Sequence, residues 1–164
     1  MEVIDPTGAV VLLAALGCAL MAGLFFAFSV AVMKALAALP SAHGIAAMQS
    51  INVVILNRAF LGVFFGTALG CLVVVIGALT DWSGLRARFA IAAALLYVIG
   101  TVLVTVVFNV PRNDALARVE PTSAEGARLW ADYLVGWTAW NHVRTAASLV
   151  STACFVLALA VPNH

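Results

Sequence analysis

The side chains best suited to chemistry in this sequence lie at positions 137–145, which read W-T-A-W-N-H-V-R-T. An imidazole can accept a proton, an amide can donate to a developing oxyanion, and a guanidinium can hold a negative charge. His142, Asn141 and Arg144 are therefore the candidate catalytic residues. Trp137 and Trp140 add flat apolar rings that suit an aromatic ligand.

Helical geometry places most of this stretch on one face. At about 100° per residue, Trp137, Trp140, Asn141 and Arg144 fall within a sector of about 120°. His142 lies about 100° from Asn141, so it flanks this face and does not centre it. We still expect all of these side chains to reach one pocket.

Further polar residues occur near the ends of other apolar segments. The candidate substrate-binding residues are Asn57, Tyr97, Asn109, Arg112, Asn113, Trp137 and Trp140. Tyr97, Thr101 and Thr105 are four apart and lead toward Asn109, which indicates a polar row on one helix. Capping of helix ends and hydrogen bonds between helices are the alternative roles for such residues.

The composition excludes a protein that lives in water. Hydrophobic residues make up 65% of the 164 residues and charged residues 9%, whereas soluble domains carry roughly 25% charged residues. The net charge of +1 gives no basis for nucleic-acid binding. We expect an integral protein of the cell membrane, surrounded by membrane lipids.

Four apolar segments reach the length of about 20 residues that crosses a bilayer. They cover about 9–33, 59–79, 89–108 and 137–161. The pattern predicts an all-α integral membrane four-helix bundle, forming a single domain over residues 1–164. Ile45, Met48, Ile51 and Ile55 recur at helical spacing, which predicts a short interfacial helix between the first two spans.

Shorter signals mark the connections. Residues 80–88 read as a tight turn, and the stretch from Pro121 to Glu125 reads as a helix start with Thr122 or Ser123 as N-cap. Gly62, Gly66, Gly70 and Gly77 share one face of the second span. We expect a neighbouring helix to approach this face closely, so that Gly66→Leu would damage folding.

An even number of spans brings the polar candidates to one membrane face. That face also carries most of the basic residues: Lys34, Arg58, Arg112, Arg118, Arg128 and Arg144, against Arg86 and Arg88 on the other. Basic residues favour the cytoplasmic side. The sequence thus predicts a cytoplasmic polar cluster with both termini outside. Asp114 is the expected partner of Arg144, because charges within spans are usually paired.

No metal ligands can be assigned from spacing. His43 and His142 have no Cys or carboxylate at ligand spacing beside them. The three cysteines fall inside apolar runs and form no C-x-x-C pair, which argues against a thiol relay.

Several stretches resemble the anthrone oxygenase-like family of small integral membrane proteins. They are A-G-L-F-F-A-F-S-V-A-V-M (22–33), A-M-Q-S-I-N (47–52), F-F-G-T (64–67), F-N-V-P-R-N-D-A-L (108–116) and W-T-A-W-N-H-V-R-T-A-A-S-L (137–149). The last two are the most specific. Lys34 and Arg58 stand where family members often have proline, so the mouth of the pocket differs here.

The resemblance implies a four-span bundle, and we expect this one in a bacterial inner membrane. It also implies oxidation of a flat, lipophilic aromatic or quinol-like substrate with O₂ through an enolate, with no required cofactor. In that reaction His142 would be the base, and Trp137 and Trp140 would stack on the rings. The enolate oxygen would be held by Asn141, Asn109, Asn113 and Arg144 or Arg112. Two other functions stay open at this stage. One is a non-catalytic membrane module that binds a lipid, a quinone or a partner subunit, with a homo-oligomer as one form. The other is a metal- or haem-dependent redox protein.

Overall fold

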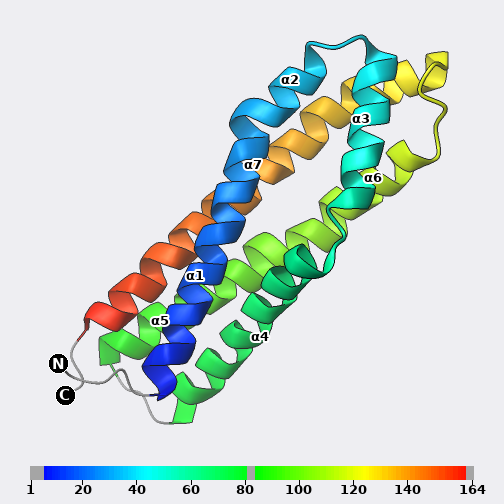
Figure 1. The fold of residues 1–164 in the computed structure, drawn as a ribbon. Coiled ribbons are helices and arrows are strands. Elements are labelled where there is room, and N and C mark those ends of the chain that lie inside the picture. The colour runs from blue at the N-terminus through cyan, green and yellow to red at the C-terminus, as the bar shows by residue number, and fades with distance from the viewer. Residues whose placement is uncertain (1–5, 81–83, 162–164) are drawn as a thin grey trace.

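The computed structural model describes residues 6–80 and 84–161, and every element within them is a helix. The helices form four long rods, and these lie side by side through much of the bundle (Figure 1). Each is long and apolar enough to cross a membrane: Pro6–Ala37, Arg58–Thr80, Gly84–Ala117 and Ala124–Ala160. The predicted all-α four-helix membrane bundle is confirmed.

Two of the rods combine α-helical and wider π-helical turns. The first consists of α1 (Pro6–Ala27), η1 (Phe28–Val32) and α2 (Met33–Ala37). The third consists of α5 (Gly84–Tyr97), η2 (Val98–Leu103), η3 (Thr105–Asn109) and α6 (Val110–Ala117). The other two rods are α4 (Arg58–Thr80) and α7 (Ala124–Ala160). Residues 81–83 of the predicted turn lie outside the described residues.

The ends of the rods follow the even topology. The start of α1, the end of α4, the start of α5 and the end of α7 lie at one end of the bundle (Figure 1). At the other end, α3 (Ser41–Val54) lies beside α6 and the first half of α7 (Figure 1). A hydrophobic core at this end joins α3 to α6 and α7 through Ile45, Met48, Leu116 and Trp130.

The last rod is one continuous helix. At 37 residues, α7 is about 55 Å long, well beyond the roughly 30 Å of a bilayer core. Its N-cap is Ser123, whose Oγ accepts a hydrogen bond from the Gly126 amide at 2.9 Å, which confirms the predicted helix start. The sequence analysis began the fourth span at about Trp137, because the charged residues before it lower the hydropathy. Those residues do not break the helix, which begins at Ala124.

The π turns keep one polar row facing α7. Four residues advance an α-helix by about 400°, so residues four apart drift by about 40° per step. Wider turns in η2 and η3 offset this drift. Thr101 and Asn109 are therefore both buried, and Thr101 Oγ1 lies 2.7 Å from Ser148 Oγ. Such π segments occur frequently at functional sites.

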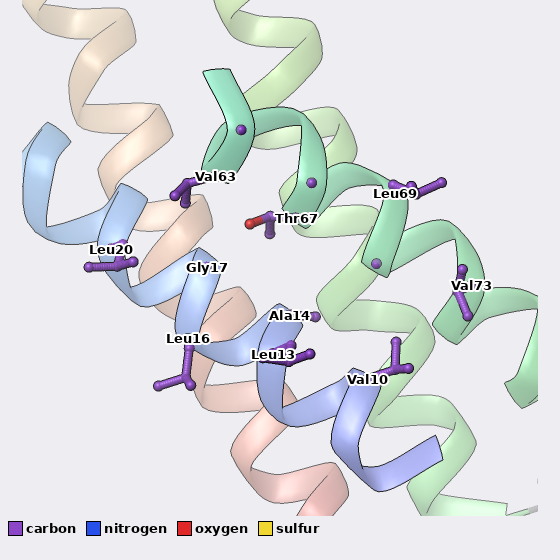
Figure 2. A pocket seen from close by; sticks show the side chains of 13 residues that line it. Val10, Leu13, Ala14, Leu16, Gly17, Leu20, Val63, Thr67, Leu69 and Val73 are labelled. Carbon is purple, nitrogen blue, oxygen red and sulfur yellow. The ribbon is translucent and has the colours of Figure 1, made fainter. Parts of the chain in front are cut away.

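The glycine face of α4 differs from the prediction. A Cβ atom at Gly62 or Gly66 would have nothing within 4 Å, and one at Gly70 would reach only Ala14 at 3.7 Å. A Cβ at Gly77 would reach Thr7 at 3.9 Å. The closest α1–α4 approach is made where Thr67 points toward Gly17 (Figure 2). Gly62 and Gly66 border an open groove between the two helices. Within this chain, Gly66 is therefore not a tight contact.

Candidate active site

Arg144 is the buried centre of the polar cluster. The side chain of this residue is 5% exposed. Its Nη2 donates to Asn141 Oδ1 at 2.7 Å, and its Nη1 donates to Thr105 Oγ1 at 3.2 Å. A helical spacing of three residues places Asn141 and Arg144 on the same face of α7, as the sequence predicted.

Asp114 is not the partner of Arg144, contrary to the prediction. Asp114 is exposed on α6, and no carboxylate pairs with Arg144 among the residues that the structure describes. The guanidinium instead lies against two aromatic rings. Its Cζ atom is 4.3 Å from the centroid of Phe25 and 5.1 Å from that of Trp137. Ring faces attract a desolvated cation but do not neutralise it.

Asn141 positions the guanidinium. Its Nδ2 donates to the Phe25 carbonyl oxygen and to Ser29 Oγ, both at 2.7 Å. A backbone carbonyl can only accept, so these contacts fix the orientation of the amide. Oδ1 is thereby turned toward Arg144. Asn141 is fully buried and acts through Arg144.

The guanidinium keeps unused donors. It carries five N–H groups, and its hydrogen bonds go only to Asn141 and Thr105 within the described chain. Arg144 Nε is buried without a hydrogen-bond partner. A buried cation with spare donors and no counter-charge favours an anionic ligand.

Arg144 forms part of the wall of a mostly apolar cavity. The cavity volume is about 100 Å³. Its wall consists of Leu24, Phe25, Phe28, Met48, Ile51, Asn52, Ile55, Leu56, Phe60, Thr105, Val110, Asn113, Trp137 and Arg144. Met48, Ile51 and Asn52 come from α3, so that helix closes one side. Gln49 holds α3 in place, because its Nε2 donates to the carbonyls of Leu116 and Val119 at 2.8 and 3.0 Å.

Asn113 supplies a second donor to the cavity. Its Oδ1 accepts hydrogen bonds from Tyr133 Oη and Trp137 Nε1, each at 2.8 Å. An indole N–H can only donate, so the oxygen of the amide must face it. Asn113 Nδ2 is then left without a partner in the described chain. Since Asn113 lines the cavity, this amide can donate to a ligand.

Asn109 lies behind the cavity wall. Its Nδ2 donates to the Trp137 carbonyl at 3.2 Å, and its side chain is 1% exposed. Asn109 Oδ1 is buried without a partner. Asn109 therefore ties η3 to α7 beside Trp137 and does not line the cavity.

His142 is turned away from the cavity. It is exposed and lines a separate groove with Lys34 and Thr138. The expectation that His142 shares a pocket with Asn141 and Arg144 is corrected, because α7 is regular at this point and carries His142 to another face. Its role as the base remains a prediction, without geometric support in this cavity.

Four other predicted site residues have structural contacts outside the cavity. Tyr97 is buried in the core, where its Oη donates to the Phe64 carbonyl at 3.1 Å. Trp140 stacks on Phe108 with ring centroids 3.5 Å apart. Arg112 Nη1 donates to the Phe108 carbonyl at 2.7 Å. Asn57 caps α4, because its Oδ1 accepts from the amides of Ala59 and Phe60.

The wall also contains residues that sequence reasoning did not select. Phe25 and Phe28 belong to the stretch 22–33 and Asn52 to the stretch 47–52, both noted above for their resemblance to the family. Their position in these stretches was the sequence signal that could have identified them as site residues. Thr105 belonged to the predicted polar row, and its contact with Arg144 could not be read from one helix alone.

No group of three or more His, Cys, Asp or Glu side chains within residues 6–80 and 84–161 is arranged to hold a metal ion.

Fold and cavity together define a four-span membrane protein whose buried guanidinium lines a mostly apolar cavity. The family model for anthrone oxygenase matches residues 55–154, more than half of the chain. The chain belongs to the anthrone oxygenase family, and at that level it is an oxygenase-type membrane protein. The matched segment contains Asn113, Trp137 and Arg144. No curated protein and no solved structure matches the chain.

Proposed function

We propose that the cavity binds a flat, lipophilic aromatic CH acid of the anthrone type as its enolate and exposes it to O₂. The supporting observation is Arg144, a buried cation that lacks a carboxylate partner among the described residues and keeps spare donors in an apolar wall. Such a group stabilises an anionic oxygen far more strongly than water-exposed arginine does.

The wall suits a ring system with more than one oxygen. Arg144 and Asn113 supply donors from α7 and α6, while Phe25, Phe28 and Trp137 supply flat apolar surface. We assign the enolate oxygen to Arg144 and a second carbonyl or phenolic oxygen to Asn113 Nδ2.

The volume of the cavity adds a structural requirement. At about 100 Å³, it is smaller than the roughly 300–1,000 Å³ of most ligand pockets. A tricyclic ligand enters only when a wall moves outward.

The reaction itself balances without an added reductant. Loss of a proton from the CH₂ group leaves a delocalised enolate, which transfers one electron to O₂. The radical and superoxide then combine through a new C–O bond, and protonation gives a hydroperoxide. Loss of water converts this carbon to a carbonyl, so CH₂ and O₂ become C=O and H₂O.

Arg144 makes the first step easier by lowering the free energy of the enolate. The described residues of the wall include no carboxylate and no imidazole, so we assign the proton to water. Organic cofactors have no part in this sequence of steps. From the basic residues at the cavity end, we also place the cavity toward the cytoplasm of a bacterial inner membrane.

The test is turnover of an anthrone by purified protein in liposomes under ¹⁸O₂. We expect the quinone to carry one labelled oxygen atom at its new carbonyl, and the rate to survive dialysis against a chelator. Loss of activity with the chelator would favour a metal-dependent redox protein. Tight binding of the anthrone without turnover would favour a non-catalytic binding module.

A further inference from the structure

A second groove lies across the α1–α7 contact from the cavity. The first rod and α7 form its two sides, and its volume is about 370 Å³. Its lining consists of Ser29, Val30, Met33, Lys34, Ala37, Leu134, Thr138 and His142. Positions 134, 138 and 142 are four apart, so they form one ridge along α7.

Two basic side chains face this groove without a partner. Lys34 and His142 are both exposed, and neither side chain forms a hydrogen bond or ion pair with a described residue. The described lining contains no carboxylate. The ionisable groups that the described lining offers to a charged ligand are therefore both basic.

The groove also has an apolar half. Val30, Met33 and Leu134 lie along the two helices beside the basic groups. Lys34 lies close to the end of the first candidate span, Pro6–Ala37. An ionisable residue at that depth is beside the head groups of the bilayer, where a basic group attracts anionic lipids.

We propose that this groove binds an anionic phospholipid. The phosphodiester lies between Lys34 and His142, and Thr138 Oγ1 is available to donate to it. One acyl chain runs along Val30, Met33 and Leu134. A zwitterionic lipid fits less well, since nothing in the described lining pairs with its ammonium group. Free phosphate would leave the apolar half unused.

The groove shares a wall with the buried cluster. Ser29 lines the groove, and its Oγ accepts the hydrogen bond from Asn141 that helps to orient Arg144. The lipid site does not depend on the oxygenase reaction and can be tested without a substrate.

The test is native mass spectrometry of the protein from micelles that contain phosphatidylglycerol and phosphatidylcholine with identical acyl chains. We expect the wild type to retain phosphatidylglycerol over phosphatidylcholine by about fivefold, given the one lysine at the site and a histidine that can donate a hydrogen bond. The double variant Lys34→Gln/His142→Gln should lose this preference. The matched control is Arg118→Gln/Arg128→Gln, which removes two exposed basic side chains at the same end and should keep it.

Three results would overturn the proposal. The first is equal retention of the two lipids by the wild type. The second is an equal loss of preference in the control variant, which would show attraction by overall charge. The third is displacement of the lipid by millimolar inorganic phosphate, which would assign the basic groups to free phosphate. Because the substituted side chains are exposed, folding is checked directly by the melting temperature of each variant.

Discussion

Replacing Arg144 with methionine removes the charge at the centre of the cavity wall and keeps a long apolar stem. An anionic ligand oxygen about 4 Å from the guanidinium gains about 4 kcal/mol at an effective dielectric constant of about 20. Each 1.4 kcal/mol is about tenfold in rate. If the enolate forms against Arg144, the Arg144→Met variant should therefore turn over anthrone about 10³-fold more slowly.

The fold should survive this change. The variant loses the hydrogen bonds to Asn141 and Thr105, and leaving such acceptors unpaired costs about 1–3 kcal/mol. Removal of a buried charge that has no carboxylate partner in the described chain offsets part of that cost. Arg144→Lys keeps a charge but loses the planar fork, so it should show an intermediate loss of rate.

The assay is the initial rate of oxygen uptake by protein in liposomes with an anthrone substrate. Arg118→Met is the control, because Arg118 is an exposed residue at the end of α6. A rate for Arg144→Met close to that of wild type, with the protein folded, would refute the assignment of Arg144 to the enolate.

Four further substitutions test the cavity wall, the role of His142 and the helix packing. Asn113→Leu should weaken binding of the quinone product by about tenfold in a fluorescence titration, since it removes a donor to the ligand; unchanged affinity would exclude Asn113 from the binding wall. His142→Ala should keep most of the oxygen uptake, because His142 lies outside the cavity; complete loss would restore it as the base. Gly100→Val should lower stability by about 1–3 kcal/mol, since a Cβ there collides with Ala147. The matched Gly66→Val should melt like wild type, and equal destabilisation would show that a partner covers the groove.

Much of the architecture follows from local physics. Apolar length defines the four spans, and the hydroxyl of Ser123 marks the start of α7. Hydropathy misses that α7 is continuous, because Glu125, Arg128 and Asp132 are polar but compatible with a helix. The open face at Gly66 is missed for another reason: a row of glycines permits close packing but does not specify whether a neighbour is present.

The site was predictable in part. The common face of Trp137, Asn141 and Arg144 follows from helical geometry, and all three join the cluster. The partners that other helices contribute could not be predicted from the sequence. The contact of Arg144 with Thr105, for example, depends on the π turns, which set how the third rod faces α7. Asn57 was selected as a site residue because it is polar and lies beside a span. In the structure its side chain caps a helix.

The central claim is that Arg144 stabilises an ionised aromatic ligand in this cavity. The direct measurement is a spectroscopic pH titration of a bound hydroxyanthraquinone, whose phenol changes colour when it ionises. A gain of about 4 kcal/mol corresponds to a pKa lowered by about 3 units. We predict that wild-type protein lowers the ligand pKa by at least about 2 units relative to empty micelles, and that Arg144→Met abolishes the shift. Identical ligand pKa values in wild type, variant and micelles would contradict the claim.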